Sequence, residues 1–87
     1  MKIYTILINS SDPEREPYAL DYSFTDRKNA TKAARETIEN LQLEYEDEGH
    51  TEIITRKDDQ NQIVAFELWQ HEDVFLTSVQ ILTTNIH

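Results

Sequence analysis

Residues 26–49 carry apolar side chains at a spacing that constrains the fold more than any other feature of the chain. Apolar residues three or four positions apart line one face of an α-helix. Thr25 or Asp26 can cap the first turn, and Gly49, the only glycine, suits a helix end that needs a left-handed residue. The residues of the apolar stripe are Ala30, Ala33, Ala34, Ile38, Leu41 and Tyr45. The stretch therefore predicts a long helix whose apolar stripe packs on a sheet.

Alternating apolar and polar residues predict five strands around this helix. We expect them at residues 1–9, 18–24, 51–57, 62–70 and 74–84. Both prolines lie in a polar loop between the first two strands, and short turns join the last three strands into an antiparallel meander. The sequence thus predicts an α+β fold of the order β-β-α-β-β-β, in which one long helix packs on a mainly antiparallel sheet of about five strands. We expect residues 1–87 to form a single domain.

One helix covers only one face of a sheet, and the strands carry apolar residues on both faces. In the first strand Ile3, Thr5 and Leu7 alternate with Tyr4, Ile6 and Ile8. In the last strand Phe75, Thr77, Val79 and Ile81 alternate with Val74, Leu76, Ser78, Gln80 and Leu82. We therefore expect Trp69 on the face that the helix leaves uncovered. One of the two alternating sets of the first strand should lie there too, either Tyr4, Ile6 and Ile8 or their alternates. Such a strip favours a homodimer or docking onto another protein.

The chain is strongly acidic, with 17 Asp and Glu against 8 Lys and Arg and a formal net charge of -9. Such a surface repels nucleic acid and attracts basic partners, including proteins that themselves bind nucleic acid. The predicted helix opens with Arg27, Lys28, Lys32 and Arg35 and ends with Glu44, Glu46, Asp47 and Glu48. This order opposes the helix dipole. Either these charges are exposed and weakly felt, or the acidic end is kept because a positive surface binds it.

No arrangement of residues in the sequence is typical of a catalytic site. The chain has no Cys, and one glycine is too few for a Gly-rich phosphate loop. No serine stands in a Gly-x-Ser-x-Gly elbow. His71, Glu72 and Asp73 resemble a metal or acid–base cluster, but neighbouring residues in a turn point apart. We therefore expect no enzyme activity, catalytic residue, metal site or cofactor.

The first residues do not have the pattern of a targeting segment. They contain one lysine and a short alternating apolar run, which is too short to span a membrane and has no small-residue cleavage site. The absence of Cys fits a reducing compartment. We expect a cytoplasmic protein that does not bind membranes.

A short, acidic, cysteine-free chain with a strand, a charged loop, a strand, an Ala-rich helix and closing antiparallel strands resembles the small phage-encoded anti-CRISPR proteins. The resemblance covers the architecture of most of the chain and involves no residue motif. It implies a non-enzymatic inhibitor in the host-cell cytoplasm that mimics the charge of DNA and occludes the basic nucleic-acid-binding groove of a CRISPR effector. The partner-binding residues would be Glu44, Tyr45, Glu46, Asp47, Glu48, Asp58, Asp59 and Trp69.

The alternative is a small structural or regulatory domain that homodimerises through the uncovered face of its sheet, with acids that serve solubility only.

Overall fold

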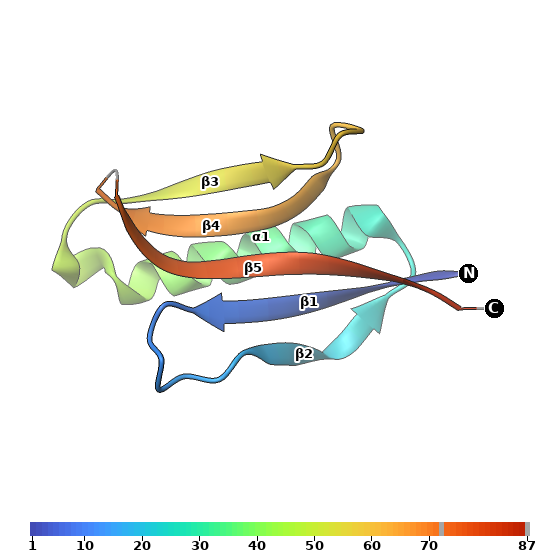
Figure 1. The fold of residues 1–87 in the computed structure, drawn as a ribbon, viewed down its shortest axis with the longest axis horizontal. Helices are drawn as coiled ribbons and strands as arrows, with labels where there is room; N and C mark the ends of the chain where they lie inside the picture. Colours follow the sequence, from blue (N-terminus) through green and yellow to red (C-terminus); the bar gives the residue numbers. More distant parts are fainter. Residues whose placement is uncertain (72, 87) are drawn as a thin grey trace.

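One α-helix lies across a five-stranded antiparallel sheet in the computed structural model, which describes residues 1–71 and 73–86 apart from the side chain of Glu48 (Figure 1). The elements are β1 (Lys2–Ser10), β2 (Tyr18–Phe24), α1 (Arg27–Glu44), the short 3₁₀ helix η1 (Glu46–Glu48), β3 (Thr51–Lys57), β4 (Ile63–Gln70) and β5 (Val74–Asn85). The predicted α+β fold and its order β-β-α-β-β-β are confirmed. Each strand lies within one residue of its predicted bounds.

The strands at the two ends of the chain form the middle of the sheet, whose order is β2-β1-β5-β4-β3. β1 and β5 are paired from Lys2 opposite Asn85 to Ser10 opposite Thr77. β1 is therefore an inner strand, as its two apolar faces predict, and β2 and β3 are the edges. The expected hairpin of β1 with β2 and the expected meander of β3, β4 and β5 are both present.

Helix α1 begins at a side-chain cap and ends where its apolar stripe ends. Asp26 is the N-cap, and its Oδ1 accepts a hydrogen bond of 3.0 Å from the backbone N–H of Lys28. The prediction that the helix continues to Gly49 is wrong, because α1 ends at Glu44 and Tyr45 is its C-cap. After Tyr45 no apolar residue remains to pack on the sheet, and the chain tightens into η1. Gly49 has a positive φ of 121°, but it follows η1 and does not cap α1.

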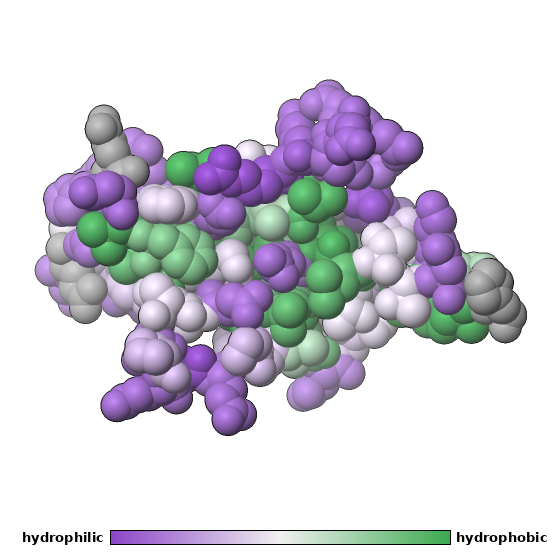
Figure 2. Space-filling model, viewed as in Figure 1, coloured by the Kyte–Doolittle hydropathy of each residue, from purple (hydrophilic) through white to green (hydrophobic). Residues whose placement is uncertain are grey.

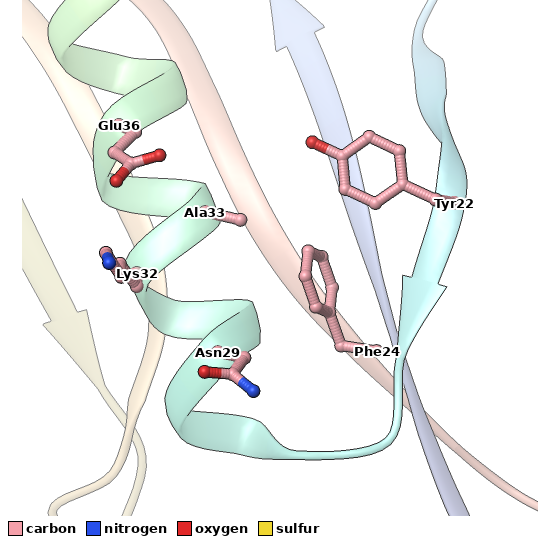
Figure 3. A pocket seen from close by; sticks show the side chains of 6 residues that line it. All are labelled: Tyr22, Phe24, Asn29, Lys32, Ala33 and Glu36. Carbon is pink, nitrogen blue, oxygen red and sulfur yellow. The ribbon is translucent and has the colours of Figure 1, made fainter.

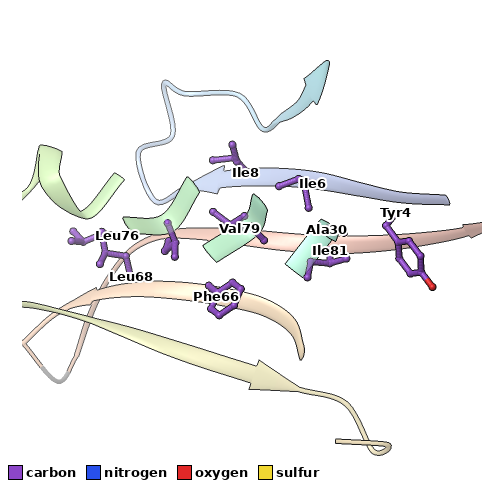
Figure 4. Packing of buried hydrophobic residues seen from close by; sticks show 11 residues of the cluster. Tyr4, Ile6, Ile8, Ala30, Phe66, Leu68, Leu76, Val79 and Ile81 are labelled. Atoms are coloured by element: carbon purple, nitrogen blue, oxygen red, sulfur yellow. The ribbon is translucent and has the colours of Figure 1, made fainter. Parts of the chain in front are cut away.

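The core lies between α1 and the face of the sheet that α1 covers (Figure 4). Its largest fully buried side chains are Phe66, Ile6, Ile38, Leu68 and Val79. Full burial of such a side chain contributes roughly 1.5 to 3 kcal/mol. Ala30 and Ala34 are also fully buried, so small side chains let the helix approach the strands closely.

A bulge in β5 changes which residues face the helix. Leu68 of β4 is opposite Thr77, whereas the next residue, Trp69, is opposite Phe75. Leu76 therefore has no partner of its own and joins the core, while Phe75 lies beside Trp69 on the other face. The predicted alternation placed Phe75 with Thr77, Val79 and Ile81, and Leu76 on the opposite side. This prediction is wrong at this end of β5, because the extra residue of the bulge moves the side chains beyond it to the opposite face of the sheet.

No described element covers the opposite face of the sheet, which we call the outer face and which points toward the viewer in Figures 1 and 2. Because Tyr4, Ile6 and Ile8 are buried with the core cluster, their alternates lie outside. The apolar residues that strand pairing places on the outer face are Ile3, Leu7, Ala19, Ile54, Ala65, Trp69, Phe75 and Leu82. Figure 2 shows apolar side chains over the middle of this face and toward one end, with polar side chains between and around them.

Candidate partner-binding site

Acidic residues from four segments meet at one end of the molecule, which we call the acidic end. The β1–β2 loop, the end of α1 with η1, the start of β3 and the β4–β5 turn all lie there, because neighbouring elements run in opposite directions (Figure 1). The described carboxylates of this end are Asp12, Glu14, Glu16, Glu44, Glu46, Asp47, Glu52 and Asp73, and all are exposed. The fold thus brings together charges that are up to 61 residues apart in the chain.

Few positive charges compensate the acidic end. Arg15 is its only described Lys or Arg, and the Arg15 Nε lies 3.9 Å from Oδ2 of Asp12. His50 Nε2 lies 3.5 Å from Oε1 of Glu52, and both side chains are largely exposed. Exposed pairs of this kind are worth about 0 to 1 kcal/mol. Most of the negative charge at this end is therefore free to act on a partner.

The opposite end of the molecule is close to electrical balance. The starts of β1 and α1 and the end of β3 lie there, with Lys2, Arg27, Lys28 and Lys57 near Asp26, Asp58 and Asp59. Along a longest dimension of 45 Å the charge therefore changes from balanced to strongly negative.

Four of the residues predicted to bind a partner lie together at the acidic end. Glu44 ends α1, Tyr45 caps it, and Glu46 and Asp47 belong to η1. The side chain of Glu48 is outside the described part. Tyr45 is half-buried against the core, and its backbone N–H donates to the carbonyl of Gln42. Tyr45 thus holds the helix end in place, while the carboxylates beside it point into solvent.

Asp58 and Asp59 lie at the other end of the molecule, in the turn between β3 and β4. The seven residues of β3 separate them from the acidic end, a length of about 23 Å. Oδ1 of Asp58 accepts hydrogen bonds from the backbone N–H groups of Gln60 and Gln62, at 2.9 and 3.0 Å. Asp58 therefore shapes the turn, and the fold does not bring these two acids to the acidic end.

Trp69 lies on the outer face, in the part of β4 closest to the acidic end, where it is opposite Glu52. Its Nε1 donates a 2.9 Å hydrogen bond to Oε1 of Glu67, and its ring meets Phe75 edge to face with centroids 5.5 Å apart. Burial acts to raise the pKa of Glu67, but the hydrogen bonds from Arg56 and Trp69 oppose it, and the pKa lies below its usual value. The indole is thus fixed in orientation on an accessible surface.

Asp12, Glu14 and Glu16 of the β1–β2 loop belong to the acidic end but are not among the predicted partner-binding residues. The order of the elements, rather than any local residue pattern, indicates that this loop lies at the acidic end. In a hairpin followed by a helix that runs back along it, the hairpin loop and the carboxyl end of the helix lie at the same end.

The described residues of the acidic end do not converge on a point. No three His, Cys, Asp or Glu side chains of the described residues are placed to hold a metal ion. His71 and Asp73 flank Glu72, which is outside the described residues. The turn that resembles a metal or acid–base cluster in the sequence is therefore described only in part. A spread of exposed carboxylates attracts a large positive surface rather than a small ligand.

No protein-family model matches this chain, and no curated protein or solved structure matches it either. Within the part of the chain that the structure describes, no helix has both the length and the apolar character needed to cross a membrane.

Proposed function

We propose that this protein is a small non-enzymatic binding protein whose acidic end docks on a basic, nucleic-acid-binding surface of a partner, such as a CRISPR effector complex, and keeps nucleic acid away from it. The observation that carries this proposal is the gathering of eight described carboxylates with a single described Lys or Arg at one end. The binding would take place in the cytoplasm, or in the host cytoplasm if a phage encodes the protein.

Electrostatic occlusion accounts for this arrangement without a catalytic group. A strand of DNA presents a phosphate about every 3.4 Å, and a protein groove that binds it is lined with Lys and Arg. Carboxylates at a helix end and in adjoining loops present negative charge to the same groove. Such charges raise the rate of association and set the orientation of docking, and their effect falls as salt is added.

The test is recovery of effector subunits on the tagged protein from cells that carry a CRISPR effector complex, at low and at high salt. Recovery at low salt and loss at high salt are expected. The variant Glu44→Lys/Glu46→Lys/Asp47→Lys should weaken binding by about ten-fold or more, because several exposed charges each contribute up to about 1 kcal/mol.

A matched pair of single variants separates the acidic end from net charge. Asp47→Lys and Asp59→Lys change the total charge equally, but the two residues lie at opposite ends of the molecule. We expect the Asp47 variant to bind less and the Asp59 variant to bind like the parent. Equal binding by the parent and the triple variant, both folded by circular dichroism, would refute the proposal.

A second candidate function, a structural or regulatory homodimer, is favoured by the charge pattern of the outer face. Charged residues make up 29% of the chain, yet among the outward-facing residues of the inner strands β1, β5 and β4 the one charge is Glu67. Arg56 of β3 neutralises it. The two longer dimensions of the molecule, 45 and 28 Å, frame a face large enough for the roughly 800 Å² that each partner contributes to a standard interface.

Sedimentation equilibrium tests this second candidate. Leu82 is 44% exposed on the outer face, and Leu43 is 61% exposed on α1. A dimer held by the outer face should dissociate in Leu82→Glu and persist in Leu43→Glu. A parent protein that stays monomeric at high concentration would exclude it.

A further inference from the structure

A groove separates the edge strand β2 from helix α1. It has a volume of about 300 Å³ and is lined by Tyr22 and Phe24 from β2 and by Asn29, Lys32, Ala33 and Glu36 from α1. Figure 3 shows the two aromatic rings on one side and the methyl group of Ala33 facing them from the helix. The rings of Tyr22 and Phe24 meet edge to face with centroids 5.3 Å apart. The groove thus has an aromatic wall and a small residue on its opposite wall.

The groove exists because α1 presents small or polar residues toward β2. The buried side of the helix, with Ala34 and Ile38, packs on the inner strands. Ala33 was expected in the apolar stripe, but it is only partly buried and faces the groove instead. No large apolar side chain from α1 therefore fills the space beside Tyr22.

Exposed apolar side chains extend this groove toward the acidic end. Tyr18 is opposite Ile8, which faces the core, and Tyr22 lines the groove, so both lie on the helix side of β2. They are 54% and 57% exposed. Leu43 follows Glu36 by two helical turns on the same side of α1 and is 61% exposed. Three of the seven large apolar residues that are exposed in the described chain therefore flank the space between β2 and α1.

The strand that borders the groove also has an unpaired edge. β2 pairs only with β1, so the backbone N–H and C=O groups along its other edge have no strand partner. Natural edge strands are often protected by Lys, Pro or a β-bulge. β2 contains no Lys or Pro, and its pairing with β1 shifts register between Thr5 and Leu7. An extended peptide that adds to such an edge gains main-chain hydrogen bonds, and its alternate side chains reach an adjoining pocket.

Charge indicates what kind of peptide fits. Lys32 and Glu36 are four residues apart on α1 and offset each other within the groove. Asp21 lies on the outer face of β2, is exposed, and makes no ion pair with another described residue. A residue opposite Asp21 on an added strand is therefore favoured when it is Lys or Arg.

We propose that β2 and the groove beside it bind an extended segment of a partner protein in which apolar and basic residues alternate. The backbone of the segment pairs with β2 as a sixth strand. Its apolar side chains enter the groove between Tyr22 and Ala33, and its basic side chains lie on the outer face beside Asp21. This site is separate from the acidic end, so either site can be tested and can fail without the other.

The proposal is tested in two steps. A phage-displayed random decapeptide library is panned on the immobilised protein, and the selected peptide is then synthesised and studied by NMR with the protein. We expect enrichment of peptides with alternating apolar and basic residues. Amide shifts should be confined to β2 and to the side of α1 that borders the groove, from Asn29 to Leu43. N-methylation of alternate peptide amides on one edge should abolish binding, and methylation on the other edge should spare it, because an added strand pairs through one edge only.

Variants of the protein provide the second part of the test. Ala33→Phe fills the groove and should weaken the peptide by about ten-fold or more, and Asp21→Asn should weaken it roughly two- to five-fold. Thr55→Phe places the same side chain on the other edge strand, β3, and should have no effect. If Ala33→Phe does not fold, Tyr22→Ala replaces it, since Tyr22 is 57% exposed.

Three results with the peptide would overturn the proposal. These are the absence of an enriched peptide family, amide shifts outside β2 and the groove, and binding that resists methylation of both peptide edges. Concentration-dependent shifts of the β2 amides without any peptide would also overturn it, because they would assign this edge to a second copy of the chain.

Discussion

Arg56 on β3 reaches diagonally across the sheet to Glu67 on β4, with its Nε and Nη2 each 2.9 Å from the same carboxylate oxygen, Oε1. That oxygen also accepts the hydrogen bond from the indole of Trp69. Three donors on one oxygen tie the edge strand β3 to the inner strand β4 on the outer face. Glu67 therefore links the ion pair with Arg56 to Trp69, one of the predicted partner-binding residues.

The ionised form of Glu67 should stabilise the fold in a pH-dependent way. Its pKa is lower in the native state than its usual value of 4.5, despite the opposing effect of burial, because of the hydrogen bonds from Arg56 and Trp69. Its contribution is therefore complete above about pH 4.5 and is lost as the pH falls through the lower native pKa. Glu67→Gln should reduce the free energy of unfolding at pH 7 by up to about 1 kcal/mol.

Urea unfolding at pH 7 and at pH 3 checks this prediction. The difference between Glu67→Gln and the parent should shrink at the lower pH. Glu52→Gln is the control, because Glu52 on β3 is 63% exposed and contacts only His50 among the described charged groups. A difference for Glu67→Gln that is the same at both pH values would contradict the assignment.

Ile38 is the helix residue on which the core depends most. It is fully buried, and truncation of such a side chain to alanine removes about 2 to 5 kcal/mol. An 87-residue domain has roughly 4 to 13 kcal/mol in total. Ile38→Ala should therefore lose a large part of the thermal stability, whereas Leu43→Ala, at a 61% exposed position, should stay within about 0.5 kcal/mol. Thermal unfolding followed by circular dichroism compares the two, and equal melting temperatures would contradict the packing described.

The elements of this fold follow from local patterns in the sequence. The stripe of Ala30, Ala34 and Ile38 determines the buried face of the helix, and alternation determines each strand. Strand order depends on which strands meet across long sequence separations, such as Ile6 with Ile81, and no local pattern contains that information. The bulge at Leu76 could not be predicted from local patterns either, because a single extra residue leaves the composition of a strand unchanged.

Only part of the candidate site could be predicted for the same reason. Glu44, Glu46 and Asp47 are neighbours in the chain, so their meeting at one end needs no tertiary information. The separation of Asp58 from them depends on the direction of β3, which runs away from the end of α1. The groove beside β2 also depends on tertiary structure, since nothing local to Ala33 distinguishes a groove wall from the buried stripe.

Gly49 should resist replacement by any L-residue. Its φ of 121° and ψ of -171° belong to a region that is open essentially to glycine alone, and an L-residue there costs about 1 to 3 kcal/mol. An added Cβ would lie 3.4 Å from Nε2 of Gln70, which is close to ordinary contact, so the loss arises from the backbone. Gly49→Ala should thus lower the melting temperature.

A D-alanine at position 49, introduced by chemical synthesis, is the matched control. For a D-residue the dihedral angles of Gly49 mirror the extended conformation that L-residues adopt readily. D-alanine should leave the melting temperature close to that of the parent. An equal loss with both enantiomers would instead indicate a steric clash.

Glu44 should affect stability and partner binding in opposite directions. It ends α1, whose last turn has no basic residue and whose first turn has no acidic residue, so the helix dipole is opposed at its carboxyl end. Glu44→Lys should stabilise the fold by about 0.3 to 1 kcal/mol. The same change removes a carboxylate from the acidic end and should weaken binding of a basic partner.

Lys28→Glu is the control for this trade-off, because it corrects the opposite end of the same helix without touching the acidic end. Both variants should unfold at higher urea concentration than the parent, and only Glu44→Lys should show reduced effector recovery at low salt. Unchanged recovery with Glu44→Lys would mean that this charge has no part in binding. A stabilising effect with reduced recovery would instead indicate that an acidic helix end is kept for its partner at the expense of the fold.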